Sequence, residues 1–326
     1  MSVVAPGEHG GDGRLVAASL GLDPAQMLDL SMSLNPFAPD PTPIVRHHLS
    51  ASTLGRYPDT SDLDAATGEL AAVLGVDPER LLLTNGGAEA IALVAVELGR
   101  GWVDEPEFSL YWRHIPVRDR SGPTFRSDPH NPSGRLAAGD DHASVWDEAF
   151  YPLATGRWTA PGRCATSVVL GSLTKVLACP GLRVGYVVVP DDDGAGLGVP
   201  GLRDRLARRQ PAWSVGPVAL AAIPELLASA DVARWSVQIT DARAELVALL
   251  RAHGLDPLPS EANFVLVPGV PGLRDALARH GVVVRACASF GLPDHIRVAV
   301  PGPEGLALLD GALTRSVATV IGRSER

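Results

Sequence analysis

The chain has 326 residues, of which 46% are apolar, so it can bury the core of one large domain and a second, smaller one. Its net charge of −9 argues against nucleic acid or an anionic membrane as partner, and no apolar run reaches the roughly 20 residues of a membrane span. Three scattered cysteines argue against a disulfide framework or a metal site, and the N-terminus lacks a secretory signal, so we expect a cytoplasmic protein that binds no metal.

Helices and short strands alternate along the first two thirds of the chain. The predicted elements are a helix over 44–52, a helix over 63–74, a strand over 81–84, a helix over 85–98, a strand over 102–106, a strand ending at 147, strands over 167–170 and 184–189, and a helix over 202–209. The glycine turn at 85–87 connects a strand to a helix, an arrangement that aims backbone N–H groups at a phosphate.

The last third of the sequence predicts a compact α+β unit, entered through a hinge at 213–217. The predicted elements are helices over 218–227 and 232–253, strands over 263–267, 282–285 and 295–300, and helices over 272–280 and 303–315.

Lys175 is the only lysine in a chain with 28 lysines and arginines. It lies between two apolar runs, and a buried lysine is costly unless its amine has a chemical task such as forming a Schiff base. The hydroxyls of Ser172 and Thr174 and the guanidinium of Arg183 could together hold a phosphate. By composition alone, a surface lysine on a loop is the competing interpretation.

The string from Ser172 to Tyr186 resembles the cofactor-lysine motif of fold-type I pyridoxal-phosphate (PLP) enzymes, with serine three residues before the lysine and arginine eight after it. Its Pro-Gly-Leu-Arg-x-Gly-Tyr ending is most similar to threonine-phosphate decarboxylases and histidinol-phosphate aminotransferases. The His-Gly-Gly-Asp segment at 9–12 and the segment 28–36 resemble the opening of the decarboxylases.

The resemblance implies a cofactor site around PLP. Lys175 would hold the cofactor covalently, and Asp147, at the end of a strand, would keep its pyridine nitrogen protonated and the ring a good electron sink. Asn131 of Asn-Pro-x-Gly would bind the 3′-oxygen. Phe108 would stack on the ring, with Tyr111 as the second candidate. The phosphate cup would comprise Gly87, Ala88, Glu89, Ser172, Thr174 and Arg183.

Tyr57, in Arg-Tyr-Pro-Asp, matches a tyrosine that reaches the cofactor phosphate of the neighbouring subunit, so the resemblance implies a homodimer. It also implies substrate contacts: Arg297 would hold a carboxylate, Arg285 a phosphate, and His9, Gly10 and Asn35 would line the pocket.

The implied fold is α/β: a large domain with a mostly parallel sheet flanked by helices, and a small α+β domain. We expect an N-terminal segment over 1–40 that packs with the small domain, a large domain over 41–212 and a small domain over 213–326. Only 20 residues separate Tyr111 from Asn131 and only 16 separate Asn131 from Asp147. Relatives fit an extra helix and strand there, which puts the usual seven strands in doubt.

The leading hypothesis is PLP-dependent decarboxylation of L-threonine O-3-phosphate to 1-amino-2-propanol phosphate, a step of cobalamin biosynthesis. It depends on the His-Gly-Gly-Asp segment, on Pro-Gly-Leu-Arg, and on Phe150, where histidinol-phosphate aminotransferases usually carry tyrosine. The alternatives are a histidinol-phosphate-type aminotransferase and a PLP-binding protein with little catalysis. The sequence leaves open which phosphorylated substrate is used.

Overall fold

The computed structural model describes residues 3–324, which contacts divide into two compact units. The smaller unit comprises the described residues of Met1–Phe37, His130–Leu136 and Val237–Arg326, and the larger one Ala38–Pro129 and Ala137–Ser236. Residues 213–236 group with the larger unit because α11 (Pro217–Ala228) packs against α4 (Thr60–Leu74).

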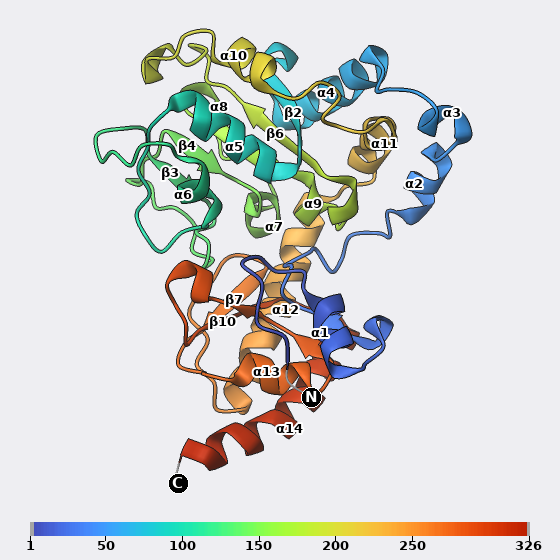
Figure 1. Ribbon diagram of the computed structural model, residues 1–326, viewed down its shortest axis with the longest axis vertical. Coiled ribbons are helices and arrows are strands. Elements are labelled where there is room, and N and C mark those ends of the chain that lie inside the picture. Colours follow the sequence, from blue (N-terminus) through green and yellow to red (C-terminus); the bar gives the residue numbers. More distant parts are fainter. Residues whose placement is uncertain (1–2, 325–326) are drawn as a thin grey trace. The chain divides into compact units, whose positions relative to one another are not determined.

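The larger unit holds most of the regular structure (Figure 1). Its strands are β2 (Leu81–Asn85), β3 (Phe125–Ser127), β4 (Val145–Asp147), β5 (Val168–Ser172) and β6 (Val184–Val188). Its helices are α2 (Thr42–His48), α3 (Ala51–Leu54), α4, α5 (Gly86–Leu98), α6 (Leu110–His114), α7 (Tyr151–Thr155), α8 (Arg163–Thr166), α9 (Leu173–Val176), α10 (Leu202–Arg209) and α11. Its 3-10 turns are η2 (Pro78–Arg80), η3 (Pro180–Leu182) and η4 (Ala195–Leu197).

The strands form one sheet in the order β2-β6-β5-β4-β3, and β6 alone runs against its neighbours. The expected mostly parallel sheet flanked by helices is therefore confirmed. Its strands are almost wholly buried and rich in Val and Leu, the pattern of a sheet covered on both faces. Helix α5 packs against β2, β5 and β6 and brings its buried apolar residues into this core (Figure 1).

Two further segments, at residues 101–102 and at residue 118, lie beside the sheet and pair only through isolated β-bridges. Trp102 pairs in parallel with Thr124, just before β3, and Gly101 pairs in parallel with Arg118. The expected strand over 102–106 is thus wrong: the chain pairs at Gly101 and Trp102 and bends away before Pro106. Among the described residues, the sheet of the larger unit therefore has five strands and two isolated bridges in place of the usual seven strands.

The predicted helix over 44–52 is also wrong in its extent. The structure has α2, an interruption at Leu49, and then α3, whose first turn is capped by Ser50 through a hydrogen bond from the amide of Thr53 (3.1 Å). A serine that accepts such a bond starts a helix rather than continuing one.

The smaller unit has a three-stranded antiparallel sheet, β7-β10-β9, and a parallel pair, β1-β8. Its elements are α1 (Gly13–Leu20), η1 (Pro24–Gln26), β1 (Leu28–Asp29), most of α12 (Val232–Ala252), β7 (Phe264–Val267), α13 (Leu273–Ala278), β8 (Val282–Val283), β9 (Arg285–Ala286), η5 (Ala288–Phe290), β10 (Ile296–Ala299) and α14 (Pro303–Ser324). The predicted strand over 282–285 is split, because its first half pairs with the N-terminal β1 and its second half with β10.

None of the helices in the described part of the chain combines the length and apolar character that crossing a bilayer requires.

Candidate active site

The strands of the larger unit bring several polar residues to one edge of the sheet. Strands β2, β3, β4 and β5 run in the same direction, so Asn85, Ser127, Asp147 and Ser172 all lie at strand carboxyl ends. In open α/β sheets this is the edge at which ligands bind.

A cradle for an anion forms where β2 enters α5. Gly86 adopts φ +73°, and Gly185 of β6 lies so close that a Cβ there would be 2.6 Å from the amide nitrogen of Gly87. Only glycine permits this approach, which leaves the first N–H groups of α5 at the sheet edge. These groups and the helix dipole favour a bound phosphate.

Three side chains complete the cradle. The hydroxyls of Ser172 and Thr174 lie 2.8 Å apart, where β5 passes directly into α9. Arg183 has a left-handed backbone (φ 56°), and its Nη2 donates to the carbonyl of Asn85 (3.4 Å) at the start of α5. Serine, threonine and arginine donors at a helix N-terminus make a suitable set for a phosphate dianion.

Glu89 contributes differently from the other predicted cup residues. Its carboxylate accepts hydrogen bonds from the amide of Asn85 (2.7 Å) and from Nε2 of Gln210 (3.0 Å). The carboxylate of Glu89 thus caps the N-terminus of α5, as a glutamate in the first turn of a helix often does. Because the carboxylate is engaged in this way, only the backbone N–H of Glu89 is available to an anion.

Lys175 lies in α9, one turn after the end of β5, and its side chain is partly buried. Its neighbours Leu173, Thr174 and Val176 are buried, which fixes this short turn against the sheet. The only lysine amine of the chain therefore lies within three residues of two cradle hydroxyls.

Asp147 ends β4 and is held by two neutral donors. Its Oδ1 accepts from the amide of Ala149 (3.0 Å), and its Oδ2 accepts from the hydroxyl of Tyr111 (3.0 Å). Burial raises the pKa of this carboxyl, and no cation pairs with it among residues 3–324. A bound cation is thus the partner that would restore its charged form. The ring of Phe108 packs edge-on to Tyr111, with centroids 6.0 Å apart.

A second acidic side chain, Glu107, lies behind this position and was not predicted from the sequence. It is 3% exposed, and it accepts from the amide of Ser127 (2.7 Å) and the amide of Phe108 (3.0 Å). The hydroxyl of Ser127 lies 2.7 Å from Oε2 and 2.8 Å from Oε1. Desolvation raises the pKa of Glu107 to about 8, and the charge of Asp147 adds to the rise.

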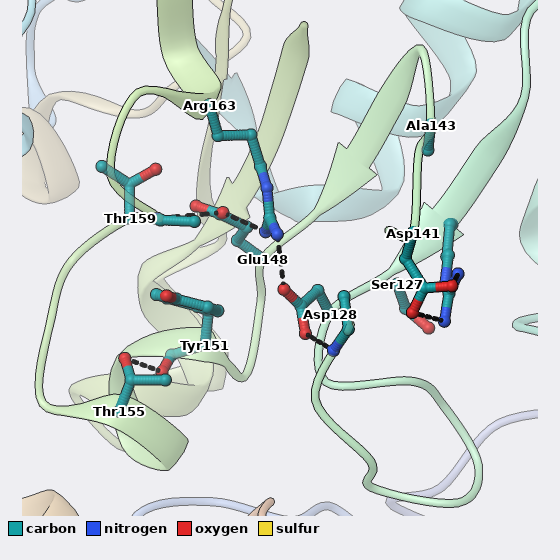
Figure 2. A network of polar contacts seen from close by, with 12 residues as sticks. Ser127, Asp128, Asp141, Ala143, Glu148, Tyr151, Thr155, Thr159 and Arg163 are labelled. Carbon is teal, nitrogen blue, oxygen red and sulfur yellow. Dashed lines mark hydrogen bonds and ion pairs between the residues drawn. The ribbon is translucent and has the colours of Figure 1, made fainter. Parts of the chain in front are cut away.

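Figure 2 shows an ionic network between Arg163, Glu148 and Asp128 that the sequence analysis did not predict. Arg163 pairs with Glu148 (2.5 Å) and with Asp128 (2.7 Å), and its guanidinium lies 4.1 Å from the ring centroid of Trp146. Both carboxylates are buried. Because Glu148 follows β4 and Asp128 follows β3, this arginine joins the carboxyl ends of the two neighbouring strands.

Tyr57 is 71% exposed and stacks on Trp213, with ring centroids 4.4 Å apart. The predicted contact of Tyr57 with a neighbouring subunit stays a prediction.

The smaller unit places two arginines opposite each other. Arg297 of β10 and Arg285 of β9 are register partners in antiparallel strands, and they are 5% and 4% exposed. Arg297 donates to Oδ1 of Asn131 (2.5 Å) and to the hydroxyl of Ser33 (3.3 Å). Burial, with a smaller contribution from the charge of Arg285, lowers the pKa of Arg297 to about 10. Two like charges buried together favour an anionic ligand.

The N-terminal candidates belong to the same unit as these arginines. Nη2 of Arg285 donates to the hydroxyl of Ser289 (3.0 Å) and to the carbonyl of Glu8, directly before His9. Its Nη1 makes no hydrogen bond to any described residue. Gly10 lies against the backbone of Ser31, where a side chain would clash, and Asn35 is buried and accepts from the amide of Phe37 (3.0 Å). The structure thus groups Asn131, a predicted cofactor contact, with Arg297.

Comparison with known proteins defines the class. A family model, Aminotransferase class I and II, matches residues 128–306. Histidinol-phosphate aminotransferase 2 of Methylococcus capsulatus is 31% identical, over 89% of this chain and 90% of that protein. The chain belongs to the class I and II aminotransferase family.

Solved structures agree on the fold. Histidinol-phosphate aminotransferase from Sinorhizobium meliloti, in complex with pyridoxal-5′-phosphate, superposes with a TM-score of 0.77 at 17% identity, covering 97% of this chain and 95% of that one. L-threonine-O-3-phosphate decarboxylase from Porphyromonas gingivalis gives 0.71 at 22% identity, covering 86% and 97%. The predicted fold-type I architecture is confirmed, and the cofactor of the family is PLP.

The side chains of the larger unit fit this cofactor. The cradle at α5 suits its phosphate, the amine of Lys175 suits its aldehyde, and the buried carboxyl of Asp147 suits a protonated pyridine nitrogen. Phe150, at the start of α7, is buried and presents no hydroxyl.

Proposed function

We propose that the protein is a PLP-dependent aminotransferase of the histidinol-phosphate type, which moves an amino group between a small phosphorylated amine and a 2-oxo acid. The histidinol-phosphate aminotransferases among its relatives support this choice at 27–31% identity over most of both chains. The sequence interpretation put decarboxylation first, and the sequence relatives favour its alternative.

The observation that carries the proposal is the pair formed by Arg285 and Arg297. Both guanidiniums are buried side by side, and desolvation lowers both pKa values, so an anion bound there would relieve an unfavourable concentration of positive charge. A phosphorylated amine and a dicarboxylic amino-group donor each supply such an anion. Arginine binds phosphate or carboxylate oxygens in a two-pronged geometry that also orients the substrate.

The roles of the other residues follow from their positions. Lys175 would hold the cofactor and then, once released, carry a proton to or from the substrate Cα, since an amine is suited to both tasks. Asp147 would stabilise positive charge at the far end of the ring. When bound, PLP supplies an electron sink that weakens the bonds at Cα. The family resemblance supports a homodimer with Tyr57 at the partner's phosphate.

Decarboxylation of L-threonine O-3-phosphate is the second candidate, which Phe150 and the similarity to the Porphyromonas gingivalis decarboxylase fold support. That substrate carries a phosphate and a carboxylate together, and Arg285 and Arg297 could bind one each. In this reaction Cα–CO₂ breaks, CO₂ leaves, and a proton takes its place on Cα. Which bond at Cα breaks depends on where Arg297 holds the carboxylate.

Parallel assays on the purified holoenzyme separate the candidates. We expect amino transfer from histidinol phosphate to a 2-oxo acid and no CO₂ release from threonine phosphate. Release of CO₂ at a comparable rate, without amino transfer, would establish the decarboxylase instead. Bound PLP with neither activity would leave a PLP-binding protein with little catalysis. An Arg297→Lys variant should raise KM for the anionic substrate at least tenfold, because lysine cannot make the bidentate contact.

A further inference from the structure

Among the described residues, the candidate site contains two carboxyl groups that are shielded from solvent and have no cation partner, Asp147 and Glu107, but the proposed chemistry assigns a task only to Asp147. Strands β3 and β4 are adjacent in the sheet, and Ser127 of β3 is the register partner of Asp147 of β4. Glu107 and Tyr111 come from one stretch of chain that passes this pair. Four polar side chains, from two strands, one loop and the start of α6, therefore meet at the end of the sheet.

Two hydrogen-bonded pairs lie next to each other here. Oε2 of Glu107 lies 2.7 Å from Oγ of Ser127, and the hydroxyl of Tyr111 donates to Oδ2 of Asp147 over 3.0 Å. Ser127 links the two pairs, because its side chain also acts on the hydroxyl of Tyr111 and lowers the pKa of that group. Ser127 has a single hydroxyl proton to donate. If Glu107 is ionised, it attracts this proton. If Glu107 is protonated, it donates to Ser127, and Ser127 is free to donate to Tyr111.

We propose that Glu107 is a positioning residue that retains its proton and sets the direction of a donor relay, from Glu107 through Ser127 and Tyr111 to Asp147, which keeps Asp147 ionised against the pyridine nitrogen of PLP. Hydrogen bonds aligned in this way polarise one another and strengthen the last donor in the series. The inference depends on PLP as the cofactor of the proposed function, and it assigns Glu107 no contact with the substrate.

Charges around Glu107 favour the protonated form. Asp147 is the titratable group that acts on it from β4, and two carboxyl groups sharing one buried site do not both ionise. The hydroxyl of Tyr111 stays protonated, because burial and both acids raise its pKa. Glu105, in the same loop, is exposed and accepts from the amide of Glu107 (3.0 Å). Of the two carboxyls, Glu107 is the one further from solvent, so it keeps the proton.

The test compares PLP affinity of wild type, Glu107→Gln, Glu107→Ala and Ser127→Ala between pH 6 and pH 10, with Glu105→Gln as the matched control. Glutamine cannot ionise, although its NH2 group would face the backbone N–H of Ser127 or of Phe108, so the PLP affinity of Glu107→Gln should not change through this residue between pH 6 and pH 10. The wild type should then lose affinity relative to Glu107→Gln by about tenfold as the pH rises through about 8, because the relay reverses. Glu107→Ala and Ser127→Ala should bind about tenfold more weakly at pH 7.

An infrared measurement gives a readout that does not depend on the cofactor. The carbonyl band of a protonated carboxylic acid should be present in wild type and Glu105→Gln at pH 7, absent in Glu107→Gln, and lost from wild type above about pH 8. Thermal unfolding of each variant controls for misfolding. A constant affinity ratio between wild type and Glu107→Gln at all pH values overturns the relay and leaves the proposed function standing. Absence of PLP binding in wild type overturns both.

Discussion

Burial without a counter-charge sets the behaviour of the individual acids in this protein. Two backbone N–H donors and the hydroxyl of Ser127 face Glu107, yet desolvation outweighs these contacts and its pKa lies at about 8. Glu148 is as deeply buried and burial also raises its pKa, but there Arg163 lies at 2.5 Å and opposes the rise. The two glutamates therefore differ in whether a cation faces the buried carboxyl group.

Glu107 should make the folding stability depend on pH. The unfolded chain ionises this carboxyl near its ordinary pKa of 4.5, whereas the folded chain binds the proton up to about pH 8. The folded state thus holds more protons in this window, and the stability falls as pH rises, by about 1.4 kcal/mol per pH unit at most from this residue. Denaturant unfolding of apoprotein should show that Glu107→Gln removes this fall between pH 5 and 8. Parallel curves for the two proteins would show that Glu107 is ionised when folded.

At the scale of elements, the close contact between β6 and the start of α5 shapes the cradle. Gly185→Ala would place a methyl group against the backbone of Gly86 and Gly87, where no side chain can move aside. We expect a loss of about 1–3 kcal/mol in unfolding free energy, as for overpacking, and at least tenfold weaker PLP binding. Gly181→Ala is the control, since a Cβ there has no neighbour within 4 Å. Equal PLP affinities for the two variants would contradict the assignment of the cradle.

The clamp made by Arg163 joins the ends of β3 and β4. Arg163→Met keeps much of the aliphatic stem but removes the guanidinium over Trp146 and leaves Glu148 and Asp128 buried without this cation, at a cost of about 3–5 kcal/mol. Calorimetric unfolding measures this loss. The control is Arg157→Met. Arg157 is exposed on the loop between α7 and α8, so this substitution should change the unfolding free energy by less than about 0.5 kcal/mol. A loss below about 1 kcal/mol for Arg163→Met would show that the clamp is dispensable.

The sequence predicts the cradle well but not the pairing of the strand over 282–285. The cradle is a local pattern: strand, glycine turn, helix, and then the lysine string, each legible within about fifteen residues of the sequence. The split of the strand over 282–285 could not be read in this way, because it depends on pairing with Leu28 and Asp29, more than two hundred residues earlier. The local periodicity of a sequence does not show which distant segment a strand will pair with.

The relay and the clamp were missed for a related reason. Glu107 precedes Ser127 by 20 residues in a stretch without regular spacing, and a glutamate after a proline gives no sign that it will be buried. Arg163 is one of many arginines, and nothing in its neighbourhood distinguishes it from the exposed Arg157. Motifs predict Lys175 and Asp147 as site residues, whereas the groups packed around Asp147 are brought together only by the sheet.

At the scale of the whole molecule, the family resemblance predicts an active site completed by a second subunit. Tyr57 and Trp213 are both largely exposed and stack on each other, which leaves the tyrosine on the surface of its own chain. Mixed dimers of Lys175→Ala and Tyr57→Ala subunits should regain activity that neither variant has alone, because one of the two sites receives an intact residue from each chain. Ultracentrifugation verifies the dimer. Mixtures no more active than the separate variants would contradict the shared site.

The measurement that tests the account most directly is borohydride reduction of the PLP-loaded protein followed by peptide mass mapping. Since the chain has one lysine, the result is unambiguous: the account predicts one pyridoxyl group per chain, on Lys175, and none in a Lys175→Arg control. An adduct confined to the N-terminal amine, or no adduct in protein saturated with PLP, would contradict it.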